Sequence, residues 1–456
     1  MSTPVIPLLE RWRASGREVA VVGLGKSGTA ATLLLRDHRI PTYASDTGTG
    51  PAFDEWAAKL SKAGATVHVG GHDLGRISGA VAVVVAPGVP PDVPPLEAAR
   101  KGGVPIHAEV DIGFLALGAT RCIGITGTNG KTTTTSLTAH VLQAGGLRAE
   151  TAGNIGRPLC DVARSDTPPD WLALELSSFQ LHDAPNLRPA IGVLTNLAPN
   201  HLDRYHSLEE YYGDKALLFR NADGGSVTVS NADDAAVQEM VRAVPGRHLR
   251  FSVRKRADAW IDRPAGRLML GPESLVPRGE LPLLGDHNVA NALTAALAAT
   301  AAGCPLDGIA SGLRTFKAIP HRVEPVREVG GVLWINDSKS TNITSTEVAI
   351  AALDRPFVLL LGGRHKGEPY ARLAGPLRER CRAVVAYGEA GPIVIEDLGK
   401  VLKVVPAGSF DEVLATARRL ARPGDAVLLS PACSSYDMFK NYEERGTRFR
   451  QSVEAL

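Results

Sequence analysis

The segment GITGTNGKTTTT, Gly124–Thr135, decides the fold more than any other part of the chain. The apolar run that ends at Thr126 predicts a strand, the glycines a turn, and Lys131 with Thr132 the start of a helix. Gly127 and Gly130 allow backbone N–H groups to approach a phosphate chain, and Lys131 adds a full positive charge. The Thr132 hydroxyl can reach a bound Mg²⁺. We therefore predict an ATP-binding loop made of Gly127, Thr128, Asn129, Gly130, Lys131, Thr132 and Thr133.

The loop departs from the general P-loop pattern in one respect. GxxxxGK[ST] would place its first glycine at Ile125, whereas the nearest glycines are Gly124 and Gly127. The loop indicates ATP binding, but by itself it does not select a reaction.

Short apolar strands alternate with helical stretches from this segment outward in both directions, which is typical of α/β domains with parallel sheets. The pattern restarts twice, so we predict three domains: 1–113, 114–318 and 319–456. The first and third resemble Rossmann-type sheets, and the second a P-loop ATPase-like parallel sheet. Within the third domain, 331–336 is expected to form an edge hairpin strand.

Composition excludes several classes of protein. Among the 456 residues, 50 Lys and Arg nearly balance 48 Asp and Glu, so nothing suggests a nucleic-acid partner. The five cysteines contain no CxxC pair, which argues against a disulfide framework or a structural zinc site. We find no signal peptide and no apolar run long enough to span a bilayer, and expect a cytoplasmic protein without membrane insertion.

Three downstream residues are candidates for metal and phosphate chemistry. Glu175 ends a predicted buried strand in ELSSFQL, His201 follows the next strand in NLAPNHLDRY, and Lys215 lies in the predicted helix EEYYGDKALLF. Carboxyl ends of parallel strands gather at one sheet edge, where ligands bind in α/β proteins. Each residue alone would be an ordinary polar residue. Their order after the ATP loop makes them candidates for one site.

The N-terminal segment GLGKSG, Gly23–Gly28, allows a different interpretation. It matches GxGxxG after a strand, and Asp46 follows Gly23 by 23 residues, as in dinucleotide-binding sheets. Taken alone, it indicates an NAD(P)-dependent oxidoreductase. A helix N-terminus accepts any diphosphate, however, and uridine diphosphate carries one.

GTNGKT resembles the ATP loop of the Mur ligase family, whose members use ATP to form amide bonds. The resemblance extends over nearly the whole chain, with motifs in family order in all three domains. It implies catalytic roles for Lys131, Glu175, His201, Lys215 and Lys339, and two Mg²⁺ sites. Thr132, Glu175, His201 and Lys215 would bind the metal, with Lys215 carbamylated by CO₂, because a plain ammonium group cannot coordinate a cation. Many relatives have an acidic residue where this chain has Asn200 beside His201.

The resemblance also assigns the substrates. In the N-terminal domain, Gly25, Lys26, Ser27, Asp46 and Thr47 would bind a UDP-linked precursor, and Asn154 of GNIG its muramoyl part. Asn288 and Asn291 of GDHNVANA would contact adenine, and Asp337 would belong to the ATP site. NDSKSTN, LLGGRHKG and SPACSSYDMFKNYEERG resemble the segments of the glutamate-adding members, which gives the glutamate-binding residues Thr341, Lys366, Ser435, Tyr436 and Tyr442.

The expected reaction joins D-glutamate to UDP-N-acetylmuramoyl-L-alanine through an acyl phosphate in a protein that we expect to be a monomer. Three alternatives remain open at this point: the same chemistry with L-glutamate, an NAD(P)-dependent oxidoreductase, and a nucleotide-sensing P-loop regulator. A folylpolyglutamate-type ligase is disfavoured because that group lacks the N-terminal UDP-type domain.

Overall fold

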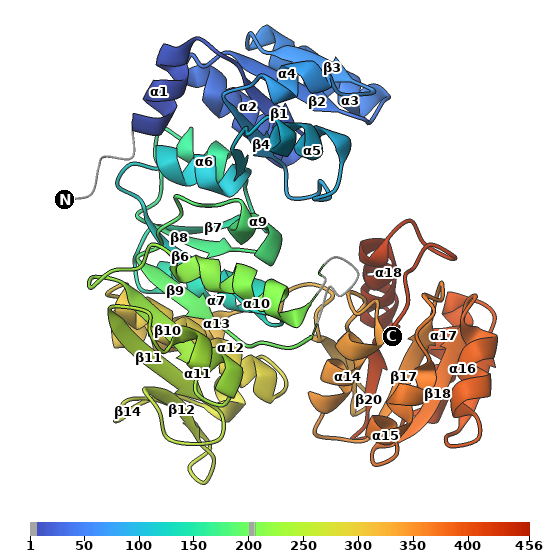
Figure 1. The fold of residues 1–456 in the computed structure, drawn as a ribbon. Coiled ribbons are helices and arrows are strands. Elements are labelled where there is room, and N and C mark those ends of the chain that lie inside the picture. The colour runs from blue at the N-terminus through green and yellow to red at the C-terminus, as the bar shows by residue number, and fades with distance from the viewer. Residues whose placement is uncertain (1–6, 200–204, 206) are drawn as a thin grey trace. The chain divides into compact units, whose positions relative to one another are not determined.

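The structure is a computed structural model that describes residues 7–199, 205 and 207–456. The described residues form three sheets of five, nine and six strands, in chain order (Figure 1). Their contacts divide the chain into two compact units. The first comprises Met1–Glu280 and Ala290–Arg314, and the second comprises Leu281–Val289 and Thr315–Leu456. The three-domain α/β architecture expected from the sequence is confirmed, and the domain boundaries remain predictions.

The N-terminal sheet is parallel, with strand order β3-β2-β1-β4-β5. The side on which successive strands are added reverses at β1: β2 and β3 lie on one side of that strand, and β4 and β5 on the other. Ligands bind at such switch points, outside the carboxyl ends of the strands. The strands are β1 (Val19–Val22), β2 (Thr42–Asp46), β3 (Thr66–Val69), β4 (Ala82–Val85) and β5 (Ile106–Ala108). The helices are α1 (Pro7–Ser15), α2 (Lys26–Asp37), α3 (Pro51–Lys62), α4 (Leu74–Ser78), α5 (Pro94–Lys101) and α6 (Glu109–Ala116).

The central sheet has the order β14-β13-β12-β11-β10-β9-β6-β8-β7 and is parallel from β7 to β12. Its switch point lies between β6 and β9. The strands are β6 (Arg121–Thr126), β7 (Ala149–Gly153), β8 (Trp171–Glu175), β9 (Ile191–Leu194), β10 (Val227–Asn231), β11 (Arg247–Ser252), β12 (Ala259–Asp262), β13 (Arg267–Leu270) and β14 (Glu273–Pro277). The helices are α7 (Lys131–Ala144), α8 (Leu159–Ala163), α9 (Ser178–His182), α10 (Leu208–Ala216), α11 (Ala235–Val241), α12 (Asp286–Ala301) and α13 (Leu306–Thr315).

The C-terminal sheet has the order β15-β16-β20-β17-β18-β19. The hairpin expected at 331–336 exists, but its edge strand is β15, because β16 also pairs with β20. The prediction of an edge position for 331–336 was therefore wrong. The strands are β15 (Glu324–Val329), β16 (Val332–Asn336), β17 (Phe357–Gly362), β18 (Cys381–Tyr387), β19 (Val404–Ala407) and β20 (Ala426–Leu429). The helices are α14 (Ile343–Ala351), α15 (Ala374–Leu377), α16 (Gly391–Leu398), α17 (Phe410–Leu420) and α18 (Tyr442–Glu454).

Both faces of the C-terminal sheet are covered, as expected for strands that are continuously apolar. Along β17, Leu359 and Leu361 belong to one buried cluster, and Val358 and Leu360 to another on the opposite face. Polar side chains that must meet a substrate are therefore confined to the strand ends. No helix among the described residues is long and apolar enough to cross a bilayer.

Candidate active site

The predicted ATP loop connects β6 to α7, and its two glycines are required by close contacts. A Cβ atom on Gly127 would come within 2.0 Å of the Thr195 hydroxyl, and Gly127 has a φ of 142°. Gly130 caps α7 with a φ of 80°, and a Cβ there would come within 2.5 Å of Asn291 Oδ1. These contacts fix the loop close to the N-terminus of a 14-residue helix. The partial positive charge of that helix end favours an anion.

Residues that directly follow β9 hold the loop in place through hydrogen bonds. Asn129 donates its N–H to Asn196 Oδ1 at 2.9 Å, and Thr195 Oγ1 donates to Asn129 O at 2.8 Å. Thr128 Oγ1 donates to Ala198 O at 3.0 Å. The sequence reasoning missed Thr195 and Asn196. Their signal was available, since the two residues follow the neighbouring buried strand where switch-point contacts are expected.

Two lysines converge on the loop. Lys131 Nζ donates to Gly127 O at 3.0 Å and Thr128 O at 2.9 Å, and Lys215 Nζ donates to Gly127 O at 2.9 Å. Lys215 is 1% exposed, with its Nζ 4.5 Å from the centroid of the Tyr211 ring. Burial, followed by the charge of Lys131, lowers the pKa of Lys215 to about 6. Lys215 is therefore mostly a neutral amine at pH 7, which is a nucleophile.

Glu175 lies at the same edge of the sheet. It ends β8 and is in register with Ile125 of β6, two residues before Gly127. Its side chain is buried, and Oε1 accepts a hydrogen bond from Asn154 Nδ2 at 2.8 Å. Oε2 is buried with no hydrogen-bond partner among the described residues. An unpaired buried carboxylate oxygen is costly unless a cation or another donor meets it, so this residue fits a divalent metal.

The structure gives less support to the other residues predicted to bind the metal. Thr132 lies in the first turn of α7 and is half-buried. His201 and its neighbour Asn200 lie outside the described residues. Within the part of the chain that the structure describes, no group of three or more His, Cys, Asp or Glu side chains could hold a metal by itself. A metal here would therefore depend on Glu175 together with hydroxyl, modified lysine or phosphate oxygens.

The two asparagines proposed for adenine face different partners. Asn291 Oδ1 accepts from the Thr134 hydroxyl at 3.1 Å and lies against Gly130 of the ATP loop. Asn288 Nδ2 donates to Leu284 O at 2.8 Å, which ties it to the residues before α12. The structure thus brings Asn291 to the loop. Asn288 belongs to the second compact unit, together with Leu284.

Five residues predicted to bind the UDP-linked precursor line one cavity of about 520 Å³ in the N-terminal domain: Gly25, Lys26, Ser27, Asp46 and Thr47. This N-terminal cavity lies where α2 begins, and Gly25 provides no side-chain cap there. Asp46 differs from the acid of a dinucleotide-binding sheet. Its Oδ2 accepts from Leu24 N at 2.7 Å and its Oδ1 from Gly48 N at 2.8 Å. Both carboxylate oxygens of Asp46 therefore hold the backbone of the site.

In the C-terminal domain, three predicted segments follow β16, β17 and β20. Because β20 pairs in parallel with both other strands, the carboxyl ends of the three lie next to one another. Asp337 is buried, and its oxygens accept from Ser430 Oγ at 2.7 Å and Val323 N at 3.1 Å. Burial raises its pKa to about 6. As with Asp46, the carboxylate oxygens of Asp337 hold neighbouring segments in place.

The predicted cationic and hydroxyl groups differ in exposure. Lys339 is half-buried, with its Nζ 3.8 Å from the ring centroid of Tyr442. Thr341 is half-buried, Lys366 and Tyr436 are exposed, and the buried Ser435 accepts the N–H of Phe439 on its carbonyl at 2.8 Å. The structure therefore joins Lys339 to Tyr442. No hydrogen bond or ion pair among the described residues joins Lys366 to the other predicted glutamate ligands.

Arg445 of α18 was not singled out from the sequence, yet it holds the segments of this site together. It is fully buried, and it donates from Nε to Ser338 Oγ at 2.9 Å and from Nη2 to Cys433 O at 3.2 Å. Its Nη1 lies 3.2 Å from the position of a Cβ on Gly363. One guanidinium group thus touches the segments that follow β16, β17 and β20. Nothing in the sequence around Arg445 indicated that this arginine is buried.

Comparison with known proteins covers all three domains. Family models match residues 17–108 as a Mur ligase MurD-like N-terminal domain, 125–299 as a Mur ligase middle domain, and 321–433 as a Mur ligase glutamate ligase domain.

Full-length relatives and solved structures agree with these matches. The chain is 39% identical to the UDP-N-acetylmuramoylalanine–D-glutamate ligase of Myxococcus xanthus, over 97% of this chain and 99% of that protein. It is 40% identical to the enzyme of the same name from Salinibacter ruber, over 96% and 97%. Its fold is similar to those of UDP-N-acetylmuramate-alanine ligase MurC from Thermotoga maritima (TM-score 0.60, 19% identity, 96% of this chain and 99% of that one) and MurF from Acinetobacter baumannii (TM-score 0.60, 17% identity, 88% of each chain).

Proposed function

The chain belongs to the Mur ligase family, and on that premise we propose that it joins D-glutamate to UDP-N-acetylmuramoyl-L-alanine at the expense of ATP, in the synthesis of peptidoglycan precursors. One observation carries the proposal: relatives of that activity match almost the whole chain, including the glutamate ligase domain. The half-buried Lys131 and the buried Lys215, which both contact the ATP loop, and the buried Glu175 at the same sheet edge support the chemistry that such a ligase needs.

The first step activates the precursor. A terminal carboxylate oxygen attacks the γ-phosphorus of ATP, the bond to ADP breaks, and an acyl phosphate forms. Residues Gly127–Thr133 hold the phosphates through backbone N–H groups and the Lys131 ammonium group. The family resemblance also assigns Asn288, Asn291 and Asp337 to the nucleotide. The contact of Asn291 with Gly130 supports its part in this assignment.

Residues that would hold Mg²⁺ are Thr132, Glu175, His201 and carbamylated Lys215, at two metal sites. When bound, Mg²⁺ offsets the charge of the phosphates and polarises the γ-phosphoryl group. The unpaired Oε2 of Glu175 supports this set, because it is a buried carboxylate oxygen at the same sheet edge as the ATP loop.

The environment of Lys215 supports its modification by CO₂. Its Nζ lone pair attacks the carbon of CO₂, one C=O electron pair moves to oxygen, and the nitrogen loses a proton to solvent. An anionic carbamate with two oxygen ligands results. Only the neutral amine can react, and burial together with the nearby Lys131 keeps Lys215 neutral at pH 7.

The second step forms the amide bond. The glutamate amine attacks the acyl carbon, a tetrahedral intermediate collapses, and phosphate leaves. The glutamate carboxylates would be held by Thr341, Lys366 and Ser435, with Tyr436 and Tyr442 beside the amino acid. Lys339 would lie near the transferred phosphate. The precursor would be held in the N-terminal cavity by Gly25, Lys26, Ser27, Asp46 and Thr47, and Asn154 would contact its muramoyl part. Its free carboxylate supplies the acyl carbon of this step.

The test measures phosphate release with Mg-ATP and UDP-N-acetylmuramoyl-L-alanine, given either D-glutamate or L-glutamate, with product mass by mass spectrometry. Turnover with D-glutamate alone is expected. Turnover only with L-glutamate would keep the ligase chemistry and change its amino acid. ATP binding without glutamate-dependent turnover would support a nucleotide-sensing regulator, and nicotinamide cofactor binding an oxidoreductase. Light scattering should show a monomer.

A further inference from the structure

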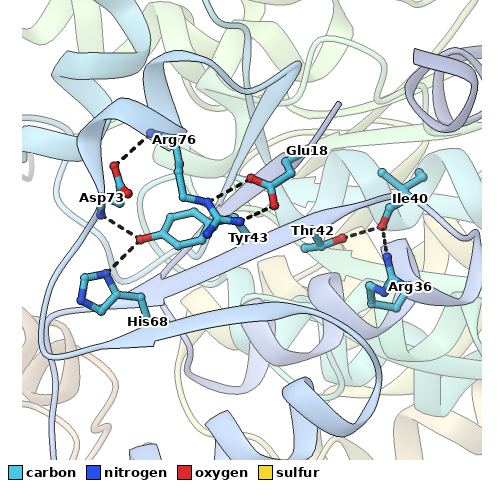
Figure 2. A network of polar contacts seen from close by, with 8 residues as sticks. All are labelled: Glu18, Arg36, Ile40, Thr42, Tyr43, His68, Asp73 and Arg76. Atoms are coloured by element: carbon cyan, nitrogen blue, oxygen red, sulfur yellow. Dashed lines mark hydrogen bonds and ion pairs between the residues drawn. The ribbon is translucent and has the colours of Figure 1, made fainter. Parts of the chain in front are cut away.

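A short segment after β3 presents His72 to the N-terminal cavity. Tyr43 of β2 anchors the residues on either side of His72. Its hydroxyl accepts the N–H of Asp73 at 2.8 Å and contacts His68 Nδ1 at 3.1 Å (Figure 2). Arg76 covers the Tyr43 ring, with its guanidinium carbon 4.7 Å from the centroid, and pairs with Glu18. The segment therefore cannot move away from the sheet without breaking several contacts.

The backbone just before His72 is anchored as well. Gly70 donates its N–H to Gly48 O at 3.1 Å, and Gly71 donates to Asp46 O at 3.0 Å. The His72 ring is then oriented by Ser45, a fully buried residue of β2, whose Oγ lies 2.9 Å from His72 Nδ1. Backbone and ring are both fixed, and His72 lines the cavity beside Asp46 and Thr47.

The second ring nitrogen, Nε2, has no hydrogen-bond partner among the described residues. Burial lowers the pKa of His72, although the nearby Asp46 opposes the shift. The ring is therefore neutral at pH 7, and Nε2 can give or take one hydrogen bond, depending on the tautomer that Ser45 selects. A half-buried, oriented imidazole with one unused nitrogen is suited to contact a ligand.

The two ends of the N-terminal cavity can be assigned to the two ends of the precursor. The cavity shares Ala86, Pro87 and Val89, at the end of β4, with a second cavity of about 640 Å³ that is also lined by Phe179 and Gln180 of the central domain. The free carboxylate of the precursor, on the alanine attached to the muramoyl group, must reach the ATP loop of that domain. The sugar therefore leaves by the β4 end, and the diphosphate lies at the start of α2. The nucleoside is left at the opposite end, beside β2.

That end contains Asp46, Thr47 and His72. In a dinucleotide-binding sheet the acid at the end of the second strand would take the ribose hydroxyls. Here both oxygens of Asp46 already accept backbone N–H groups. His72 adds to this end an oriented imidazole, held by Ser45, that can contact the nucleoside.

We propose that His72 is a specificity-determining residue that hydrogen-bonds through Nε2 to the pyrimidine ring of the uridine diphosphate portion of the substrate. This assignment rests on the proposed function for the presence of a UDP-linked precursor. It adds a base-reading contact to a site whose other predicted residues hold the phosphates and the turn.

The experiment compares three variants of the full chain by calorimetric titration with UDP and with inorganic pyrophosphate. His72→Asn keeps a polar atom near Ser45 but removes the atom at the Nε2 position. It should weaken UDP binding about five- to tenfold, the value of one hydrogen bond, and leave pyrophosphate binding unchanged. His72→Gln, which returns a polar atom near the Nε2 position, should recover most of the affinity. His38→Asn, at an exposed histidine of the same domain, should bind UDP like the parent protein.

Two results would overturn the proposal. Equal affinity of His72→Asn and the parent for UDP would show that the ring makes no contact with the base. Equal loss for UDP and pyrophosphate would show that His72 acts on the phosphate end or on the fold of the cavity. Ligase kinetics keep the two proposals separate: in His72→Asn, a raised KM for the precursor with unchanged kcat is expected, whereas a parent protein without any turnover would contradict the proposed function and not the UDP contact.

Discussion

Lys215→Met should stabilise the central domain at neutral pH while abolishing ligase activity. Methionine fills a similar volume and does not titrate. Folding of the variant therefore no longer requires the loss of a proton at this buried position. The hydrogen bond to Gly127 O is lost, but that carbonyl still accepts from Lys131 Nζ at 3.0 Å. The substitution therefore leaves no unpaired backbone group at the ATP loop.

The size of the effect follows from the pKa of Lys215, which is lowered from 10.5 to about 6 in the folded protein. Between these values the unfolded chain binds a proton that the folded chain does not. Parent stability therefore falls as the pH drops from about 10.5 to about 6, by roughly 1.4 kcal/mol per pH unit. The Met variant has no such dependence at this position. Its advantage over the parent should grow by about 2–3 kcal/mol between pH 9 and pH 7.

Amide hydrogen exchange of peptides from β6 and α10 is the suitable assay, because a chain of several domains does not unfold in one two-state transition. The buffers must be free of CO₂, since carbamylation would replace the amine. Lys255→Met, at an exposed lysine of the same domain, should follow the pH dependence of the parent. A parent-minus-variant difference that stays constant from pH 9 to pH 7 would refute the neutral amine, and with it the basis for carbamylation. Lys215→Ala should also lose activity and regain part of it with added short carboxylates.

Three further substitutions test other parts of the site. Glu175→Gln should raise the Mg²⁺ concentration for half-maximal turnover at least tenfold, because an amide oxygen carries no charge to offer the cation; a Mg²⁺ titration of phosphate release measures this. Lys366→Ala should raise the KM for glutamate about 10- to 100-fold with little change in the KM for ATP, as expected for the loss of one hydrogen bond to a charged group. Arg445→Ala should raise the KM for glutamate and lower the unfolding temperature, and added guanidinium should partly restore the KM; unchanged glutamate kinetics would contradict its role in holding the three segments.

The sequence predicted well those features that depend on local pattern. The glycines of the ATP loop, the strand before it and the helix from Lys131 all follow from residue types within a dozen positions. The hairpin of β13 and β14 was missed, although RLML and ESLVP flank a glycine turn at Gly271. The edge position given to 331–336 was wrong because strand order depends on β20, almost a hundred residues later.

The site was harder to predict where a residue's role depends on distant partners. The family resemblance assigned Asp46 to the UDP-linked precursor and Asp337 to the ATP site. In the structure their oxygens hold backbone and hydroxyl groups that no sequence pattern identifies. Arg445 shows the opposite case. A charged residue in a helix is usually solvated, and only the tertiary fold reveals that this one is internal.

The glycine pattern at Gly23–Gly28 explains why the oxidoreductase interpretation was attractive and why it does not hold for this chain. A Cβ on Gly28 would come within 1.6 Å of Gly23 O, so that glycine is needed for α2 to pack against β1. The pattern thus encodes a close helix–strand approach and a diphosphate crevice, which several nucleotides can share. The identity of the nucleotide must come from side chains around the crevice. Since Asp46 holds the turn and the segment at His72 is fixed against the same end of the cavity, base recognition here is carried by a residue that the glycine pattern does not contain.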